Sequence, residues 1–154
     1  MELILWRHAE AETGEPDLGR KLTAKGEKQA RRVAEWLHAH LPESARILTS
    51  PATRATQTAA VLAELAHRKF KVVDLLAPGA TAEEVLRAAE WLHAKVPVVV
   101  VGHQPTLGWV ASRLLAGEEQ PWSVKKAAAW WLSARTRAHE PQVILRAVIN
   151  PDLV

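Results

Sequence analysis

Two histidines and two arginines lie at or just after the ends of apolar segments, where they could form a binding or catalytic site. Arg7 and His8 directly follow a short apolar run near the N-terminus, and His103 comes one glycine after a second, stronger apolar run. Arg54 lies in the stretch SPATRATQT, which follows a third apolar run. Burying cationic groups at the end of such segments costs folding free energy unless an anion pairs with them. This combination of residue types predicts an oxyanion site, with phosphate as the natural ligand.

Each of these residue types has a chemical reason to be present. The planar guanidinium of arginine binds two oxygens at once and stays charged, so we expect Arg7 and Arg54 to hold phosphate. A neutral imidazole can attack phosphorus, and we expect His8 to be the nucleophile and His103 to stabilise the transferred phosphoryl group. A metal site on His8, His103 and Asp74 is the alternative, but two arginines beside it would repel a cation. We therefore expect no metal and no cofactor.

Parallel strands are needed to bring these distant residues together. Apolar runs alternate with stretches of helical period, which predicts an α/β fold with helices on both faces of the sheet. The carboxyl ends of parallel strands lie at one edge, so the four residues can meet there. Two later strands, separated by a polar turn at 135–140, predict an antiparallel pair. The expected strands cover residues 3–6, 46–49, 71–73, 96–101, 127–134 and 143–149. The expected helices carry apolar positions over residues 30–41, 55–66, 85–92 and 107–114, with helix starts at Thr23 and at Ser50-Pro51.

Composition limits the class of protein. The chain has 154 residues, typical of one domain, so we expect a single domain over residues 1–154. A net charge of +3 modestly favours anionic ligands, and no basic cluster with interleaved aromatic residues indicates nucleic-acid binding. The absence of cysteine excludes disulfides and thiolate chemistry. No apolar stretch approaches the ~18 residues that span a membrane, so we expect a cytoplasmic protein. The oligomeric state is left open.

Four motifs together resemble a known family. LWRHAEA, LTAKGEKQA, TSPATRATQT and VVVVGHQPTLG occur in the order and at the separations seen in the histidine phosphatase superfamily, the Arg-His-Gly phosphatases that include phosphoglycerate mutases. The short chain resembles the small bacterial branch of SixA-type phosphohistidine phosphatases. The resemblance implies a three-layer αβα fold with a mostly parallel central sheet, like that of phosphoglycerate mutase. It also implies that His8 is the phosphorylated nucleophile. By the same resemblance, Arg7 and Arg54 are phosphate clamps and His103 is the second histidine of the pocket.

Three further positions bear on the resemblance. Arg20 matches a basic residue of the small branch near the mouth of the pocket, where it would contact phosphate or substrate. The motif usually has glycine after the histidine, and here it is Ala9. Many relatives place a carboxylic acid at the position that corresponds to Leu75. Asp74 should point the other way if the segment is extended, and Glu10 is a second candidate, so the general acid is left open.

A pocket poor in general acid favours phosphohistidine as the substrate. An alkoxide leaving group needs a donated proton, whereas the imidazole of phosphohistidine leaves near its own pKa of ~6.5. We therefore expect a metal-independent phosphatase that forms a covalent phosphohistidine on His8 and acts on phosphohistidine in signalling proteins. The alternatives are a small-molecule phosphomonoesterase with the same core and a non-catalytic module that binds phosphoprotein. Gln57 and Thr58 share a helix face with Arg54, and we expect them to orient it.

Overall fold

One six-stranded sheet forms the centre of the protein. The computed structural model describes residues 1–154 and gives the strand order β3-β2-β4-β1-β5-β6. The strands are β1 (Glu2–Arg7), β2 (Arg46–Thr49), β3 (Lys71–Val72), β4 (Val98–Gly102), β5 (Ala129–Arg137) and β6 (Glu140–Ile149). The first four pair in parallel, and β5 and β6 join them in antiparallel fashion. The predicted α/β fold with an antiparallel C-terminal pair is confirmed.

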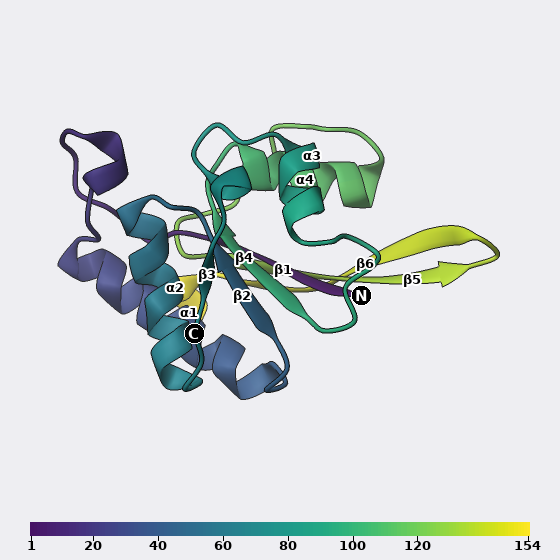
Figure 1. The fold of residues 1–154 in the computed structure, drawn as a ribbon, viewed down its shortest axis with the longest axis horizontal. Coiled ribbons are helices and arrows are strands. Elements are labelled where there is room, and N and C mark those ends of the chain that lie inside the picture. Colours follow the sequence, from purple (N-terminus) through teal and green to yellow (C-terminus); the bar gives the residue numbers. More distant parts are fainter.

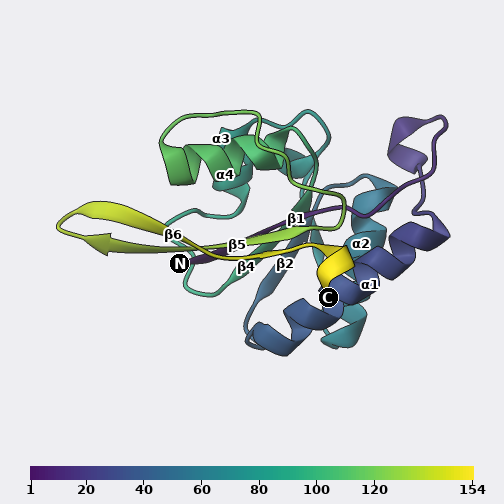
Figure 2. The same cartoon turned by 180° about the vertical axis from the view of Figure 1, so that it is seen from behind.

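Helices cover both faces of the sheet and complete three layers (Figure 1). The helices α1 (Ala24–His40) and α2 (Thr53–Leu65) lie on one face, and α3 (Ala82–Ala88) and α4 (Thr106–Ala116) lie on the other. Seen from behind, the C-terminal 3₁₀ turn (Pro151–Leu153) lies beside α1 (Figure 2). None of the helices combines the length and the apolar character that crossing a membrane requires.

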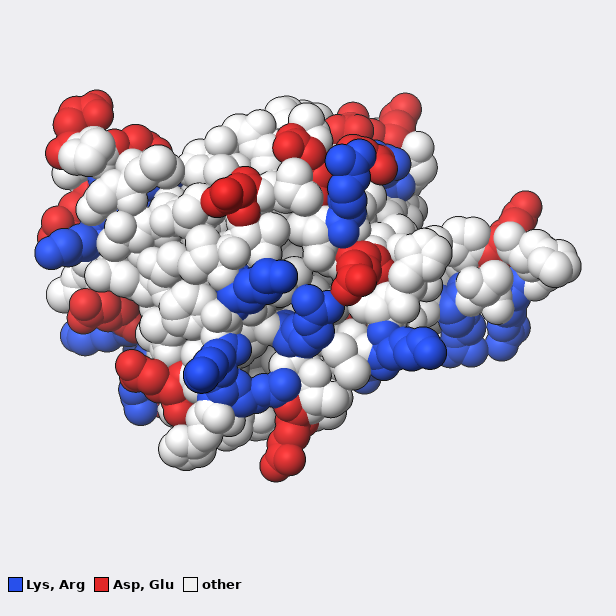
Figure 3. Space-filling model, viewed as in Figure 1, with Lys and Arg blue, Asp and Glu red and all other residues white.

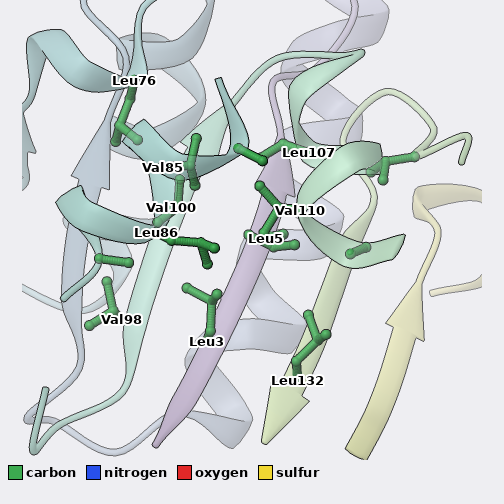
Figure 4. Packing of buried hydrophobic residues seen from close by; sticks show 14 of the residues in the cluster. Leu3, Leu5, Leu76, Val85, Leu86, Val98, Val100, Leu107, Val110 and Leu132 are labelled. Carbon is green, nitrogen blue, oxygen red and sulfur yellow. The ribbon is translucent and has the colours of Figure 1, made fainter. Parts of the chain in front are cut away.

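Alternate side chains of the central strands enter two separate cores. Leu3 and Leu5 of β1 pack against the layer of α3 and α4, whereas Ile4 and Trp6 pack against the layer of α1 and α2. Figure 4 shows the first of these cores, with Leu107 of α4 close to β1. Because β1 and β4 are buried on both faces, their sequences are unbroken apolar runs instead of alternating ones.

The pairing of β1 with β4 determines where the predicted site residues lie. Arg7 at the end of β1 pairs with Gly102 at the end of β4. The His8 amide then donates to the Gly102 carbonyl at 3.1 Å, so His8 and His103 leave the sheet side by side. On the other side of β4, the Ser50 amide donates to the last-but-one carbonyl of that strand at 3.0 Å. The chain after β2 therefore leaves the sheet at the same edge.

The predicted start of α1 is confirmed, and the predicted start of α2 is wrong. Thr23 is the N-cap of α1, and its side chain accepts a hydrogen bond from the Gly26 amide at 2.9 Å. The second helix begins at Thr53 and not at 50–51. The reason is that the Ser50 hydroxyl accepts a hydrogen bond from the Ala52 amide at 3.2 Å, which holds residues 50–52 in a bend before the helix starts.

The helix α3 and the two strands of the C-terminal hairpin also differ in extent from the sequence prediction. The helix α3 ends at Ala88 and not near residue 92, since Glu90 and Leu92 have φ angles of 53° and 69°. The turn expected at 135–140 is shorter, and β5 and β6 are correspondingly longer. Ala138 and His139, which connect them, have φ angles of 50° and 68°, the left-handed conformation that tight hairpins require.

Gly26 is the point at which α1 packs on the loop after His8. A Cβ atom at this position would overlap the backbone carbonyl of Glu10, so the helix or the loop would have to move. We expect Gly26→Ala to lower the free energy of unfolding by about 1–3 kcal/mol, although alanine normally stabilises a helix relative to glycine. Urea denaturation measures the change. The control is Gly19→Ala, whose Cβ would only touch Pro16 at 3.4 Å. A Gly26→Ala protein as stable as the wild type would contradict this close packing.

Candidate active site

Two buried imidazoles form the centre of the candidate site. The exposed fractions of His8 and His103 are 7% and 5%. Their ring centroids are 5.0 Å apart and their planes are inclined by 54°. His103 also lies against the chain after β2, because its Nε2 is 2.7 Å from Ser50 Oγ. The structure therefore brings the two predicted histidines together.

The hydrogen-bond partners of the two rings differ in what they reveal about the position of the ring proton. His8 Nδ1 is 2.8 Å from the Ala9 carbonyl, which can only accept, so Nδ1 carries the proton and Nε2 keeps its lone pair. The Ser50 hydroxyl accepts from the Ala52 amide with one of its two lone pairs, so in its 2.7 Å contact with His103 Nε2 either group can be the donor. His103 Nδ1 has no hydrogen-bond partner, and it carries the proton of the neutral ring when Ser50 is the donor to Nε2.

Three arginines surround the imidazoles. Arg7 donates through Nη1 to a backbone carbonyl of the loop before β5 at 2.9 Å. Arg54, in the first turn of α2, is 5% exposed and donates to both the backbone carbonyl and the carboxylate of Asp17, at 2.9 and 3.2 Å. Arg20 Nε lies 3.5 Å from the same carboxylate. The positive charges of all three arginines lower the pKa of His8, as expected for close neighbours.

The buried side-chain nitrogen and oxygen atoms that lack a hydrogen-bond partner all belong to residues of this site. Buried side-chain nitrogen or oxygen atoms without a hydrogen-bond partner occur at four places, which are Arg7 Nε, Arg20 Nε, Arg54 Nε and His103 Nδ1. Buried polar atoms are almost always paired in folded proteins, so such a group requires an explanation. A single anion with several oxygens can accept hydrogen bonds from more than one of these donors.

Burial keeps both imidazoles neutral at ordinary pH. It lowers the pKa of His8 to about 4, an effect that the neighbouring guanidiniums reinforce and the hydrogen bond to the next carbonyl opposes. Burial also lowers the pKa of His103 to about 3, together with charge repulsion from His8 and Arg54. At neutral pH the Nε2 lone pair of His8 is therefore available for attack on an electrophile.

The candidate general acids lie outside this network. Glu10 accepts a hydrogen bond from the Thr23 hydroxyl at 2.8 Å and so supports the start of α1. Asp74 is exposed and begins a 3₁₀ helix, so the strand alternation that was expected to orient it does not apply. The side chain of neither residue is hydrogen-bonded to His8 or His103. These two histidines and Asp74 also do not form a group that could hold a metal ion.

Gln57 and Thr58 act on backbone groups and not on the guanidinium of Arg54. Thr58 Oγ1 donates to the Arg54 carbonyl at 2.8 Å and accepts from the Ala9 amide at 3.1 Å. Gln57 Oε1 accepts from the Leu22 amide at 2.8 Å. Both side chains therefore hold the segments that follow β1 against α2. Ala9 is completely buried there, so its methyl group is accommodated.

Sequence reasoning missed two members of the site. Asp17 pairs with both Arg54 and Arg20, and its only sequence signal is the three-residue spacing to Arg20. Ser50 was interpreted as a helix start, whereas its hydroxyl contacts His103. Its position directly after a parallel strand, at the same edge as the histidines, is the signal that could have found it.

Comparisons with known proteins agree on one family. The family model for branch 1 of the histidine phosphatase superfamily matches residues 3–78. The chain is 33% identical over 134 residues to the phosphohistidine phosphatase SixA homolog of Haemophilus influenzae. The match covers 79% of this chain and 80% of that protein. It is 28% identical over 137 residues to phosphohistidine phosphatase SixA of Escherichia coli, with 84% and 83% of the two chains covered. The solved structure of the protein histidine phosphatase SixA complexed with tungstate matches with a TM-score of 0.81 over 99% of both chains, at 23% identity.

The neutral buried histidines predict a loss of stability at acid pH. Both have a pKa in the folded protein far below the ~6.5 of the unfolded chain, so below pH 6.5 only the unfolded state gains these two protons. We expect the contribution of the two histidines to the free energy of unfolding to be complete above about pH 6.5. It should fall as the pH drops to about 4 and stop changing near pH 3.

Urea denaturation at a series of pH values measures this dependence. His103→Gln removes one of the two groups and is expected to reduce the slope between pH 6 and 4 by about 1.4 kcal/mol per pH unit. The exposed His38 provides the control, since His38→Gln should leave the slope unchanged. An unchanged slope in His103→Gln would show that this histidine is protonated in the folded protein.

Proposed function

Because the chain belongs to the histidine phosphatase superfamily as a SixA-type phosphatase, we propose that it hydrolyses phosphohistidine in signalling proteins through a covalent intermediate on His8, without a metal. The observation that carries this proposal is the group of buried, unpartnered donors around the His8 imidazole. No other buried polar side-chain atom of the chain lacks a partner. A phosphoryl group satisfies these donors and places phosphorus beside a neutral nucleophile.

The first chemical step is an in-line displacement at phosphorus. His8 Nε2 donates its lone pair to form the N–P bond, while the bond from phosphorus to the leaving group breaks and the leaving group takes that electron pair. Arg7, Arg54 and the Nδ1–H of His103 stabilise the charge on the phosphoryl oxygens. Arg20, half-buried and beside Asp17, adds positive charge at the edge of the site.

The second step returns the enzyme to its starting state. Water attacks phosphorus, the N–P bond breaks, and its electron pair returns to His8 Nε2 as inorganic phosphate forms. The proton on Nδ1 stays on the ring throughout, held by the Ala9 carbonyl at 2.8 Å. The imidazole therefore leaves as a neutral molecule and needs no proton from a separate acid.

The leaving group is the reason for choosing phosphohistidine as the substrate. Glu10 is hydrogen-bonded to Thr23 and Asp74 is exposed. The one carboxyl group of the network, that of Asp17, is paired with Arg54 and Arg20, so it does not suit the role of proton donor to an alkoxide. An imidazole leaves without such help because its pKa is ~6.5. The names of the relatives from Haemophilus influenzae and Escherichia coli support the same substrate. A cytoplasmic location and a single domain over residues 1–154 stay predictions from the sequence.

Removing the nucleophile tests the covalent mechanism. We expect His8→Ala to reduce kcat by about 10³-fold or more, since a covalent step loses its acceptor atom. Binding of inorganic phosphate, measured by calorimetry, should remain because the arginines and His103 are still present. In the wild type, labelled phosphate should be trapped at residue 8 under alkaline quench. His38→Ala is the matched control, and wild-type turnover by His8→Ala would contradict the mechanism.

A side-by-side assay tests the substrate and the metal independence. With EDTA present, we expect kcat/KM for a phosphohistidine protein to exceed that for sugar phosphates by about 10²-fold, the contribution of one general acid. An aryl phosphate, with its better leaving group, should fall between them. Loss of activity on chelation would contradict the metal-free mechanism, and a preference for sugar phosphates would contradict the substrate. No turnover of any of these compounds would favour a phosphoprotein-binding module.

A further inference from the structure

A pocket with a strongly basic lining adjoins the candidate active site, with which it shares Arg7. Its cavity volume is about 570 Å³, and apart from Pro151 its lining is polar or charged. Its walls come from the first turns of α1, the loop before β5 and the C-terminal turn, which Figure 2 shows beside α1. Six of the lining residues are cationic, namely Arg7, Lys25, Lys28, Arg32, Lys125 and Lys126. We call this cavity the basic pocket.

The positive charge in the basic pocket is concentrated and unpaired. The whole chain has a net charge of +3, whereas the pocket sets six cations against one acid, Asp152. None of the six makes an ion pair, although other arginines do, such as Arg46 with Glu90 and Arg113 with Glu83. On the face drawn in Figure 3, basic and acidic side chains are both present. Converging like charges repel one another, and a bound anion would relieve that repulsion.

Arg7 connects the basic pocket to the candidate active site. Its Nη1 donates to the Val124 carbonyl at 2.9 Å, in the loop that carries two of the pocket lysines. Its charge also lowers the pKa of His8. On the other wall, Gln29 of α1 accepts a hydrogen bond from the Glu10 amide at 3.1 Å, just after His8. An anion in the pocket therefore lies next to a phosphoryl group bound at His8.

We propose that the basic pocket receives acidic side chains that flank the phosphohistidine of the substrate protein. This inference rests on the proposed function and specifies the surface of its substrate. Flexible lysine amines suit carboxylates presented by a protein surface, and they raise the rate of encounter with an acidic partner. The lining offers no aromatic or aliphatic wall for the apolar part of a nucleotide or a lipid.

Matched phosphohistidine peptides test this inference. One peptide carries glutamates on both sides of the phosphohistidine, and the other carries glutamines. We expect kcat/KM of the wild type to be roughly tenfold higher for the glutamate peptide at low salt, and the two values to converge at high salt as the charges are screened. The triple variant Lys28→Gln, Lys125→Gln, Lys126→Gln should lose this preference. Its kcat/KM for the glutamine peptide and for an aryl phosphate should match the wild type.

The control variant also replaces three lysines by glutamine, but outside the basic pocket. Lys69→Gln, Lys71→Gln and Lys95→Gln together remove three exposed lysines outside the basic pocket, and this variant should keep the preference. A wild type without preference, a pocket variant that retains it, or a control variant that loses it equally would overturn the inference. Tripolyphosphate that binds through the same lysines while the glutamate peptide does not would also overturn it, in favour of an inorganic polyanion.

The failure of the proposed function is distinguishable from the failure of this inference. If neither phosphohistidine peptide is hydrolysed while the aryl phosphate is, the substrate assignment is wrong. Fluorescence anisotropy of the unphosphorylated peptides then tests the pocket alone. Binding of the glutamate peptide that the pocket variant loses would support acidic docking, and equal binding of both peptides would overturn it.

Discussion

The parallel pairing of β1 with β4 is the constraint on which the rest of the site depends. The strands come from distant parts of the chain, and the pairing of Arg7 with Gly102 sets their two histidines side by side. A slip of one residue would exchange the side chains of a strand between the two cores, moving Leu5 to the layer of α1 and α2. Core packing therefore determines the position of the imidazoles, although none of the core residues takes part in the chemistry.

Burial gives the site both its energetic cost and its reactivity. Guanidiniums held out of water without counter-charges destabilise the fold, and only Arg54 and Arg20 share a carboxylate, that of the exposed Asp17. The imidazoles avoid adding to this cost by staying neutral, because burial lowers their pKa values. A neutral His8 is also the form that can attack phosphorus. In the proposed mechanism, the burial that destabilises the fold is therefore also what activates His8 as the nucleophile.

The features that the sequence predicts correctly all depend on continuous segments of the chain. Arg7, His8 and His103 directly follow buried strands, and the ends of parallel strands must meet. The features that the sequence does not predict depend on which distant segments come into contact in the folded chain. The contact of Asp17 with Arg54 joins an exposed turn to a helix 37 residues later. The hairpin turn at 138–139 has neither the glycine nor the asparagine that usually marks such turns. The basic pocket gathers cations from several segments, and only Lys125-Lys126 form a pair in the sequence.

The central position of β1 has a consequence for synthesis on the ribosome. It is made well before both of its neighbours, β4 and β5, which come much later in the chain. Until they emerge, the apolar segment Leu3–Trp6 has no strand to pair with and exposes hydrophobic surface that favours aggregation. Such long-range closure slows folding, and a partial chain that contains His8 but not β4 lacks the second imidazole of the site. The two histidines can therefore come together only after β4 has been made and has paired with β1.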